Sequence, residues 1–267
     1  MDLGLDGKLA LVTGSNRGTG SLIARAIARE GATVAVHGPS EGSQEAVLGA
    51  IAASGGEAFA VSGDITTDAG AARVLGELAG RGASVDVLVN NLGGPSGTRW
   101  FETATEPWIE AYQANTLSMV RMIHGCVPGM KARGWGRVIQ LATIGVWRPN
   151  ARMPDYYAAK AAVASLTASL ARELSGTGVT VNTVSPGLIH TPEVEAYLRS
   201  RAARKGWGED WEQIEARGVE DLMPNACGRM AKPEEVADLV LFLASDRAGY
   251  VNAVNLRIDG GALGLSS

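Results

Sequence analysis

The chain has 267 residues, of which 46% are hydrophobic and 19% charged, and its formal net charge is −4. This length and composition fit one globular unit with a large core and exclude a disordered or collagen-like chain. The acidic balance argues against a nucleic-acid partner, and the lack of any run of about 18 apolar residues argues against a membrane span. The acidic start MDLGLDGK is unlike a secretory signal, so we expect a soluble cytoplasmic protein.

Short apolar runs rich in strand-forming residues alternate with longer amphipathic stretches along most of the chain. Such alternation predicts right-handed crossovers and a doubly wound α/β fold, in which helices cover both faces of a parallel sheet. The predicted strands cover residues 9–13, 33–37, 58–62, 85–90, 136–143, 179–185 and 253–259. The predicted helices cover residues 18–30, 41–54, 68–81, 106–133, 155–175 and 233–244.

A polar and charged segment at about residues 188–231 has a different, irregular texture. It contains Trp207 and Trp211. Its length predicts a mobile lid over a substrate site. The two tryptophans, spaced i,i+4, are equally compatible with contact to substrate and with packing inside the lid.

A glycine-rich turn directly follows the first predicted strand, with the spacing Gly14-x-x-x-Gly18-x-Gly20. Glycines let a pyrophosphate approach the backbone, and the start of the next helix offers free N–H groups. Many glycine runs are plain turns, and this chain has 35 glycines. The order of strand, glycine turn and helix nevertheless favours a dinucleotide site.

Tyr156 and Lys160 lie four residues apart in a predicted alanine-rich helix, so both side chains share one helix face. A phenol has an ordinary pKa of about 10, and a nearby cation lowers it. The pair is therefore a candidate proton shuttle in which Lys160 lowers the pKa of Tyr156. Taken alone, the same pattern also arises by chance on solvated helices.

Four motifs occur together: Thr13-Gly14-x-x-x-Gly18-x-Gly20, Asn90-Asn91-Leu92-Gly93, Tyr156-x-x-x-Lys160 and Pro186-Gly187. In this order and spacing the chain resembles the short-chain dehydrogenase/reductase family, in particular its 3-oxoacyl-reductase-like subgroup, over about residues 8–261. The resemblance implies a Rossmann-type single domain over residues 1–267. It also implies hydride transfer between a nicotinamide cofactor and a carbonyl or alcohol.

The resemblance further implies a catalytic set of four residues. Tyr156 matches the family acid–base, and Lys160 matches the residue that binds the nicotinamide ribose and holds the phenolate charge. Asn115 matches an asparagine that holds a water between Lys160 and solvent, an ordinary helix asparagine being the alternative. Thr143 stands where most relatives have serine, and its hydroxyl can donate the same hydrogen bond to the substrate oxygen.

The end of the second predicted strand, where an acid commonly binds the ribose of NAD, carries no acid before Glu41. NADP(H) is therefore favoured over NAD(H). We expect Arg17, His37 and Ser40 to hold its 2′-phosphate. Pro39 departs from the family pattern, since many NADP-dependent relatives have an arginine there.

The remaining cofactor residues are implied by the family pattern. Asp64 and Ile65 match the adenine site, with a helix-cap region as the alternative for Asp64. The backbone of Ile189 and the hydroxyl of Thr191 match the contacts to the nicotinamide carboxamide. The predicted cofactor-binding set also includes Gly14, Asn16, Gly18, Thr19, Gly20, Asn91, Gly93, Tyr156, Lys160, Pro186 and Gly187.

The substrate is predicted to be a hydrophobic ketone or secondary alcohol, cyclic and aromatic ones included. Trp147 and Trp207 are its expected contacts, beside Thr143 and Tyr156. The main alternative is a 3-oxoacyl thioester on an acidic carrier, which calls for a basic patch that the sequence does not clearly show. An alternative of another class is an NADP(H)-binding sensor or scaffold without turnover.

The sequence predicts no metal site, and it predicts that the chains assemble into an oligomer. The two cysteines and three histidines show no metal-ligand spacing. The family commonly forms tetramers through its long helices. Residues 106–133 and 155–175 carry apolar side chains on more than one face, so we expect a homotetramer.

Overall fold

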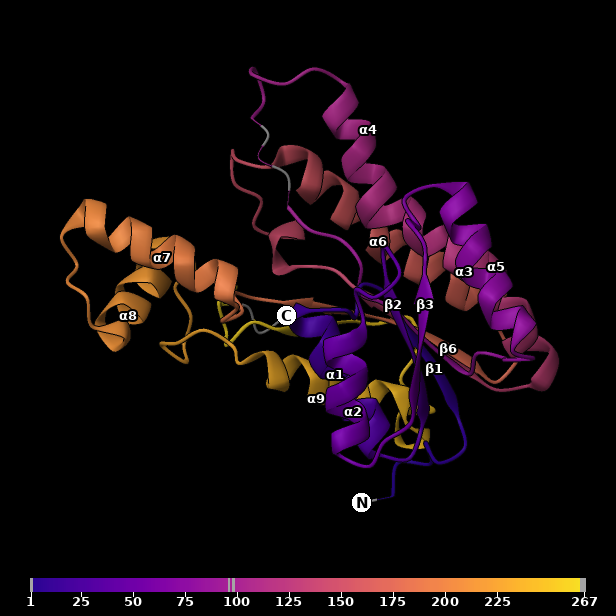
Figure 1. Ribbon diagram of the computed structural model, residues 1–267. Coiled ribbons are helices and arrows are strands. Elements are labelled where there is room, and N and C mark those ends of the chain that lie inside the picture. Colours follow the sequence, from indigo (N-terminus) through magenta and orange to yellow (C-terminus); the bar gives the residue numbers. More distant parts are fainter. Residues whose placement is uncertain (1, 96, 98, 265–267) are drawn as a thin grey trace.

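A seven-stranded parallel sheet forms the centre of the computed structural model, which describes residues 2–95, 97 and 99–264 (Figure 1). The strand order is β3-β2-β1-β4-β5-β6-β7, and every neighbouring pair is parallel. The strands are β1 (Leu9–Val12), β2 (Thr33–Gly38), β3 (Ala58–Ser62), β4 (Val87–Asn90), β5 (Gly136–Leu141), β6 (Val179–Pro186) and β7 (Asn255–Ile258). This confirms the predicted doubly wound α/β fold.

Helices connect the strands and cover the sheet. The α-helices are α1 (Gly18–Arg29), α2 (Glu45–Ala53), α3 (Asp68–Gly80), α4 (Glu106–Tyr112), α5 (Ser118–Arg133), α6 (Pro154–Glu173), α7 (Pro192–Lys205), α8 (Trp211–Leu222) and α9 (Pro233–Ala244). Shorter helical turns are η1 (Gln113–Leu117), η2 (Ile144–Val146) and η3 (Asp246–Ala248).

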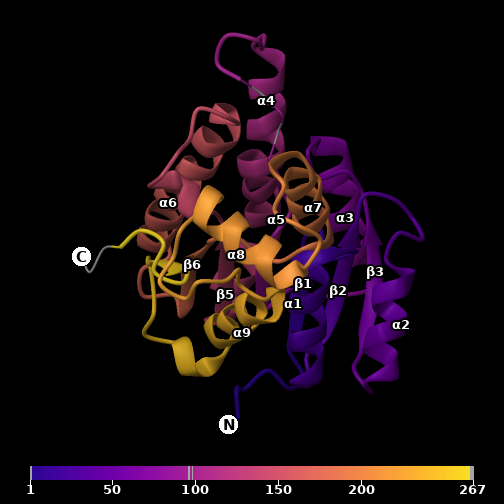
Figure 2. The same ribbon diagram turned by 90° about the vertical axis from the view of Figure 1, so that its left-hand side faces the viewer.

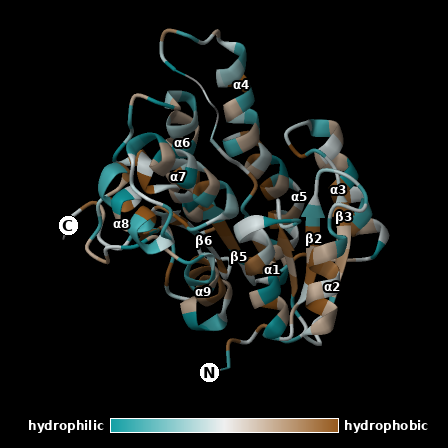
Figure 3. Cartoon of the chain, turned by 60° about the vertical axis from the view of Figure 1, so that its left-hand side comes forward, coloured by the Kyte–Doolittle hydropathy of each residue, from teal (hydrophilic) through white to brown (hydrophobic). Residues whose placement is uncertain are grey.

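Two hydrophobic cores lie on opposite faces of the sheet because successive strand residues point to opposite sides. Val12 belongs to the core under α1, α2 and α9, whereas its neighbour Leu11 belongs to the core under α3, α5 and α6. The central strands are hydrophobic along their length, as expected for strands buried on both faces (Figure 3).

Three predicted elements differ from the observed ones. The helix predicted over residues 106–133 consists of α4, the π-helical turn η1 and α5, because one turn is widened by an extra residue around the buried Asn115. The helix predicted from residue 41 begins at Glu45, after a turn in which Gly42 has a φ of +79°. The irregular segment contains two helices, α7 and α8, which project from one side of the fold (Figure 1).

The sheet has its topological switch point between β1 and β4, since the chain moves outward from β1 to β3 and then returns to β4 beside β1. Loops diverge at such a point and leave a crevice at the carboxyl ends of the strands, where ligands bind. Helices α7 and α8 stand in front of the sheet in Figure 2, which shows the side that lies at the left in Figure 1. The described helices include none with the length and apolarity of a transmembrane segment.

Candidate active site

The glycine turn after β1 has the geometry of a phosphate cradle. Gly14 and Gly18 adopt φ values of +61° and +56°, which favour glycine, and a Cβ on Gly20 would lie 2.5 Å from the carbonyl oxygen of Gly14. Helix α1 starts at Gly18, and its N-cap residue Arg17 makes no side-chain capping hydrogen bond within the described chain. The first amides of α1 are therefore available to a pyrophosphate, and the space beside Gly18 is open. Asn16 and Thr19 are partly exposed in the same turn.

Thr13 and Asn91 tie the glycine turn to the end of β4. The Thr13 hydroxyl accepts hydrogen bonds from the N–H groups of Asn91 and Leu92, both at 3.0 Å. The Asn91 amide donates to the carbonyls of Thr13 at 2.9 Å and Gly14 at 3.1 Å. These bonds fix the two loops that border the switch-point crevice.

His37 is a structural residue, and its predicted contact with a 2′-phosphate is wrong. The side chain is fully buried, its Nδ1 accepts from Gly14 N–H at 2.9 Å, and its Nε2 faces the Gly63 carbonyl at 2.9 Å. These partners require a neutral ring with the proton on Nε2. Burial also lowers the pKa of His37, so the ring carries no positive charge for a phosphate at neutral pH.

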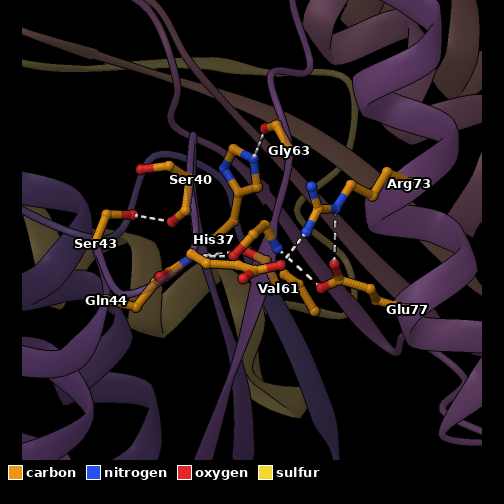
Figure 4. A network of polar contacts seen from close by, with 10 residues as sticks. His37, Ser40, Ser43, Gln44, Val61, Gly63, Arg73 and Glu77 are labelled. Carbon is orange, nitrogen blue, oxygen red and sulfur yellow. Dashed lines mark hydrogen bonds and ion pairs between the residues drawn. The ribbon is translucent and has the colours of Figure 1, made fainter.

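The turn after β2 is shaped around Gly38 and contains Ser40 and Ser43 (Figure 4). A Cβ on Gly38 would collide with the Ser43 hydroxyl and lie 3.0 Å from Gln44 Nε2, so an acid at this strand end does not fit without rearrangement. Ser40 is exposed, and its carbonyl accepts from the Ser43 hydroxyl at 2.7 Å. The Ser40 side chain is therefore open to solvent.

The second predicted phosphate residue, Arg17, faces the first turn of α7. Its Nη1 lies 3.9 Å from Glu193 Oε1, and both side chains are largely exposed. Exposed pairs of this kind contribute little stability. Arg17 is therefore free to exchange Glu193 for another anion.

Asp64 and Ile65 follow β3 with different exposures. Asp64 Oδ1 accepts from the backbone N–H and the hydroxyl of Thr66, at 3.0 and 2.7 Å, in the turn that precedes the N-cap residue Thr67. The Ile65 side chain is buried in the core under α3. Only the backbone of Ile65 can therefore face an adenine.

Tyr156 and Thr143 meet in the structure. Tyr156 lies in the first turn of α6, and its phenol lies close enough to the Thr143 side chain to be affected by its hydroxyl. Thr143 has extended backbone and caps η2, where its hydroxyl accepts from Gly145 N–H at 3.2 Å. Because that bond uses an oxygen lone pair, the hydroxyl proton remains available to a second oxygen.

The predicted effect of Lys160 on Tyr156 is not found. Burial raises the pKa of Tyr156 to about 12, with a smaller contribution from Tyr157, and the Thr143 hydroxyl only partly opposes it. Burial lowers the pKa of Lys160 to about 7, and its Nζ donates to the Leu141 carbonyl at 2.7 Å. For Tyr156, the loss of hydration of the phenolate outweighs any attraction to the Lys160 charge, so the phenol is protonated at neutral pH.

Asn115 lies beside Lys160 around Gly93. Its Oδ1 accepts from Gly94 N–H at 2.9 Å, and its Nδ2 donates to the Gly94 and Ala111 carbonyls at 3.2 and 3.0 Å. A Cβ on Gly93 would lie 2.5 Å from Asn115 Oδ1 and 3.0 Å from Lys160 Nζ. The π-helical turn and a residue without a side chain at position 93 are both needed to bring these groups together.

The loop after β6 leads from Pro186 into α7. Gly187 N–H donates to the Ile258 carbonyl at 2.9 Å, and Ile189 forms an isolated parallel bridge with Ala231. The Thr191 hydroxyl caps α7 by accepting a backbone N–H three residues on, at 3.3 Å. The same side chain is also hydrogen-bonded to the carboxylate of Glu193.

Trp207 packs inside the lid, and its predicted contact with substrate stays a prediction. Helices α7 and α8 enclose a small core of their own, and Trp207 is 9% exposed within it. Helices α7 and α8 are short and project away from the sheet, so they can bury little apolar surface against each other. A large side chain between them supplies much of the apolar area that is buried there. This core consists of Leu198, Ala202, Trp207, Ile214, Val219 and Met230.

Trp211 and His190 join α8 to the loop after β6, a contact that the sequence analysis missed. Their rings stack at 4.8 Å between centroids and 20° between planes. Glu195 lies 3.0 Å from His190 Nε2 and 2.8 Å from Arg199 Nη2. The spacing of Glu195 and Arg199 was a usable signal, but nothing local links His190 to Trp211.

The aromatic side chains near the site fall into two groups. Trp147 follows η2 and is 45% exposed. Trp100 and Trp108 instead line a separate, mainly apolar hollow of about 490 Å³ together with Tyr157. This hollow borders a different face of α6 from that of Tyr156 and Lys160, because residues one position apart point in different directions.

Known proteins share both sequence and fold with this chain. A family profile described as enoyl-(acyl carrier protein) reductase matches residues 14–262. The 3-oxoacyl-[acyl-carrier-protein] reductase of Vibrio cholerae is 34% identical over 97% of this chain and 98% of its own length.

Solved structures agree. The L-sorbose reductase of Gluconobacter frateurii, in complex with NADPH and L-sorbose, has a TM-score of 0.92 and 32% identity, covering 99% of this chain and 100% of that chain. A 3-oxoacyl (acyl-carrier-protein) reductase of Agrobacterium tumefaciens with NADP bound has a TM-score of 0.86 and 35% identity. The match covers 97% of this chain and 95% of that chain. Fold and site thus define a nicotinamide-dependent oxidoreductase of CH–OH and C=O groups. The chain belongs to the short-chain dehydrogenase/reductase family.

Proposed function

We propose that this protein is an NADP(H)-dependent oxidoreductase that interconverts a ketone and a secondary alcohol. The observation that carries the proposal is the approach of the Tyr156 phenol to the Thr143 hydroxyl, with Lys160 on the same face of α6. The glycine turn fits a pyrophosphate, and the end of β2, where an acid would select NAD, carries Gly38, at which a side chain would have to displace Ser43 and Gln44. The bound nicotinamide supplies or accepts the hydride.

The side chains divide the remaining work. In reduction, Tyr156 gives its proton to the carbonyl oxygen, which its raised pKa permits because the phenol stays protonated at neutral pH. Thr143, held by Gly145 N–H, donates a hydrogen bond that orients that oxygen. Lys160 holds the ribose, and Asn115 fixes the Gly94 turn beside it. Residues 188–231, which include helices α7 and α8, act as a lid over the site.

The proposed substrate is a ketone with an apolar face that packs on Trp147. The apolar wall is smaller than the sequence indicates, because Trp207 is buried within the lid. A 3-oxoacyl thioester is the second candidate. It is supported by the Vibrio cholerae relative and by a backbone bridge that brings Arg99 and Arg152 together near the start of α6.

The direct test is turnover with both cofactors on a panel of cyclic ketones, a 3-oxoacyl thioester and a ketose. Wild type should oxidise NADPH with at least one class, and its kcat/KM for NADPH should exceed that for NADH by about tenfold or more, a margin that one charge-assisted contact supplies. Arg17→Ala should lose most of this preference, because its kcat/KM for NADPH should fall while that for NADH stays nearly unchanged. A preference for NADH would contradict the cofactor assignment. Cofactor binding without turnover on any ketone would support the sensor alternative.

We also propose a homotetramer that acts in the cytoplasm, where the free thiols Cys126 and Cys227 stay reduced. Two separate faces expose large apolar side chains, and two isologous interfaces are what a tetramer with three twofold axes needs. One face, around α4, exposes Phe101 and Ile109, and the other, around α9 and β7, exposes Phe242, Tyr250 and Val254.

Light scattering at micromolar concentration should give four times the 27.7 kDa chain mass. Tyr250→Asp places a charge in one proposed interface, so it should yield a dimer with an unchanged circular dichroism spectrum. A monomer mass for wild type would contradict the assembly.

A further inference from the structure

Arg73 on α3 reaches across the carboxyl ends of β2 and β3 to the turn that contains Ser40 (Figure 4). Its Nη2 lies 2.5 Å from Glu41 Oε1, and its Nε lies 3.2 Å from Glu77 Oε1. One guanidinium therefore joins two carboxylates that are 36 residues apart in the chain.

Glu77 anchors this arrangement to the sheet. Its second oxygen, Oε2, accepts from Ser62 N–H at 3.0 Å at the end of β3. A carboxylate bonded to both the strand end and Arg73 restricts where the guanidinium lies. Arg73 is thereby positioned beside the β2–α2 turn, where it pairs with Glu41, whose side chain is 82% exposed.

Glu41 is the first acid in the sequence after the end of β2. It directly follows Ser40, at the strand end where this fold places the ribose 2′ substituent. A free carboxylate there would repel a 2′-phosphate and would accept hydrogen bonds from an unphosphorylated ribose, which favours NAD(H). Its charge is instead paired with Arg73, which comes from an element that the sequence does not link to this turn.

We propose that Arg73 is a specificity-determining residue, which sustains the preference for NADP(H) by neutralising Glu41 and holding it away from the 2′-phosphate. Arg73 acts through Glu41, not by contact with the cofactor. This inference rests on the proposed NADP(H) dependence. It adds a residue of α3 to the residues of the glycine turn and of the end of β2 that are proposed to select the cofactor.

The test is a double-mutant cycle on the ratio of kcat/KM for NADPH to that for NADH, with dissociation constants from cofactor fluorescence. Arg73→Ala should lower the ratio about fivefold, because the exposed Glu41 charge then opposes the phosphate. Glu41→Gln alone should change it less than about twofold, since that charge is already paired. In the Glu41→Gln background, Arg73→Ala should again have an effect below about twofold.

Two controls each remove a charge of the same sign from a nearby position that lies outside the Arg73–Glu41 pair. Arg81→Ala removes a cation from the far end of α3, where the guanidinium stacks on Phe59 at 4.6 Å. Glu45→Gln removes an acid from the first turn of α2. Neither should move the ratio by more than about twofold, whereas an effect equal to that of Arg73→Ala would show that only general charge matters and would overturn the inference.

The outcomes separate this inference from the function on which it rests. If wild type lacks an NADPH preference, the proposed cofactor is wrong. If wild type has the preference and Arg17→Ala abolishes it but Arg73→Ala does not change it, only the role of Arg73 fails. If Arg73→Ala lowers the ratio equally with and without Glu41→Gln, Arg73 acts on the phosphate directly and the proposed mechanism is overturned.

Discussion

Tyr156→Phe should lower kcat by about 100-fold or more in either direction while NADPH still binds with the wild-type dissociation constant. The substitution removes only the hydroxyl, and general acid–base catalysis contributes a factor of this size. The variant also loses the contact of the phenol hydroxyl with Thr143, but the ring stays in place at the start of α6. Steady-state rates together with cofactor fluorescence separate lost chemistry from lost binding.

The pH dependence gives an independent check on the same residue. Burial raises the pKa of Tyr156 to about 12, so the phenol is protonated and the phenolate scarce at neutral pH. Alcohol oxidation, which needs the base, should therefore rise with pH by up to about tenfold per unit, whereas ketone reduction, which needs the acid, should stay flat. Tyr156→Phe should abolish the rise. A variant that keeps more than about a tenth of the wild-type kcat would remove Tyr156 from its role.

Thr143→Val should lower kcat by about 100-fold, the scale of losing one hydrogen-bond donor to a reacting oxygen. Valine has nearly the same shape, so the space beside Tyr156 stays filled. Its loss of the acceptor for Gly145 N–H costs about 1 kcal/mol of stability, the usual value of a helix cap. Thermal unfolding of the variant measures that smaller effect separately from kcat.

Thr143→Ser is the matched control, because it retains the hydroxyl and removes only the methyl group. It should keep its activity within about threefold of wild type, since both the Gly145 and the Tyr156 contacts remain possible. Equal activity in the valine and serine variants would show that position 143 only packs.

Most of the fold could be predicted because its signals are local. Every predicted strand lies on an observed strand, and the helix predicted at residues 233–244 matches α9 residue for residue. The π-helical turn η1 was missed, because the residues of 113–117 suit an ordinary helix and the extra residue in the turn serves the contacts of Asn115 with Gly94. The bounds of α7 and α8 were not predicted within the irregular segment, although its charged residues at 193–205 fit a solvated helix face, because polar surfaces on both helices hide a short apolar stripe.

The candidate site likewise has features that the sequence predicts and features that it does not. The glycine turn was predictable, since its φ values and close approaches demand glycine wherever the chain places them. The electrostatics were not predictable. The spacing of Tyr156 and Lys160 indicates a cation beside a phenol, but the pKa of each group is set by how deeply the surrounding strands and loops bury it.

The sequence by itself determined the alternation of strands and helices, the position of the glycine turn and the shared helix face of Tyr156 and Lys160, because each depends on neighbours within a few residues. Only the tertiary structure decided that His37 braces the glycine turn as a neutral ring, that Trp207 seals the core of the lid and that Arg73 holds Glu41. The physical reason is burial and long-range pairing. A side chain's charge and availability depend on which distant segments cover it, and no local pattern records that contact.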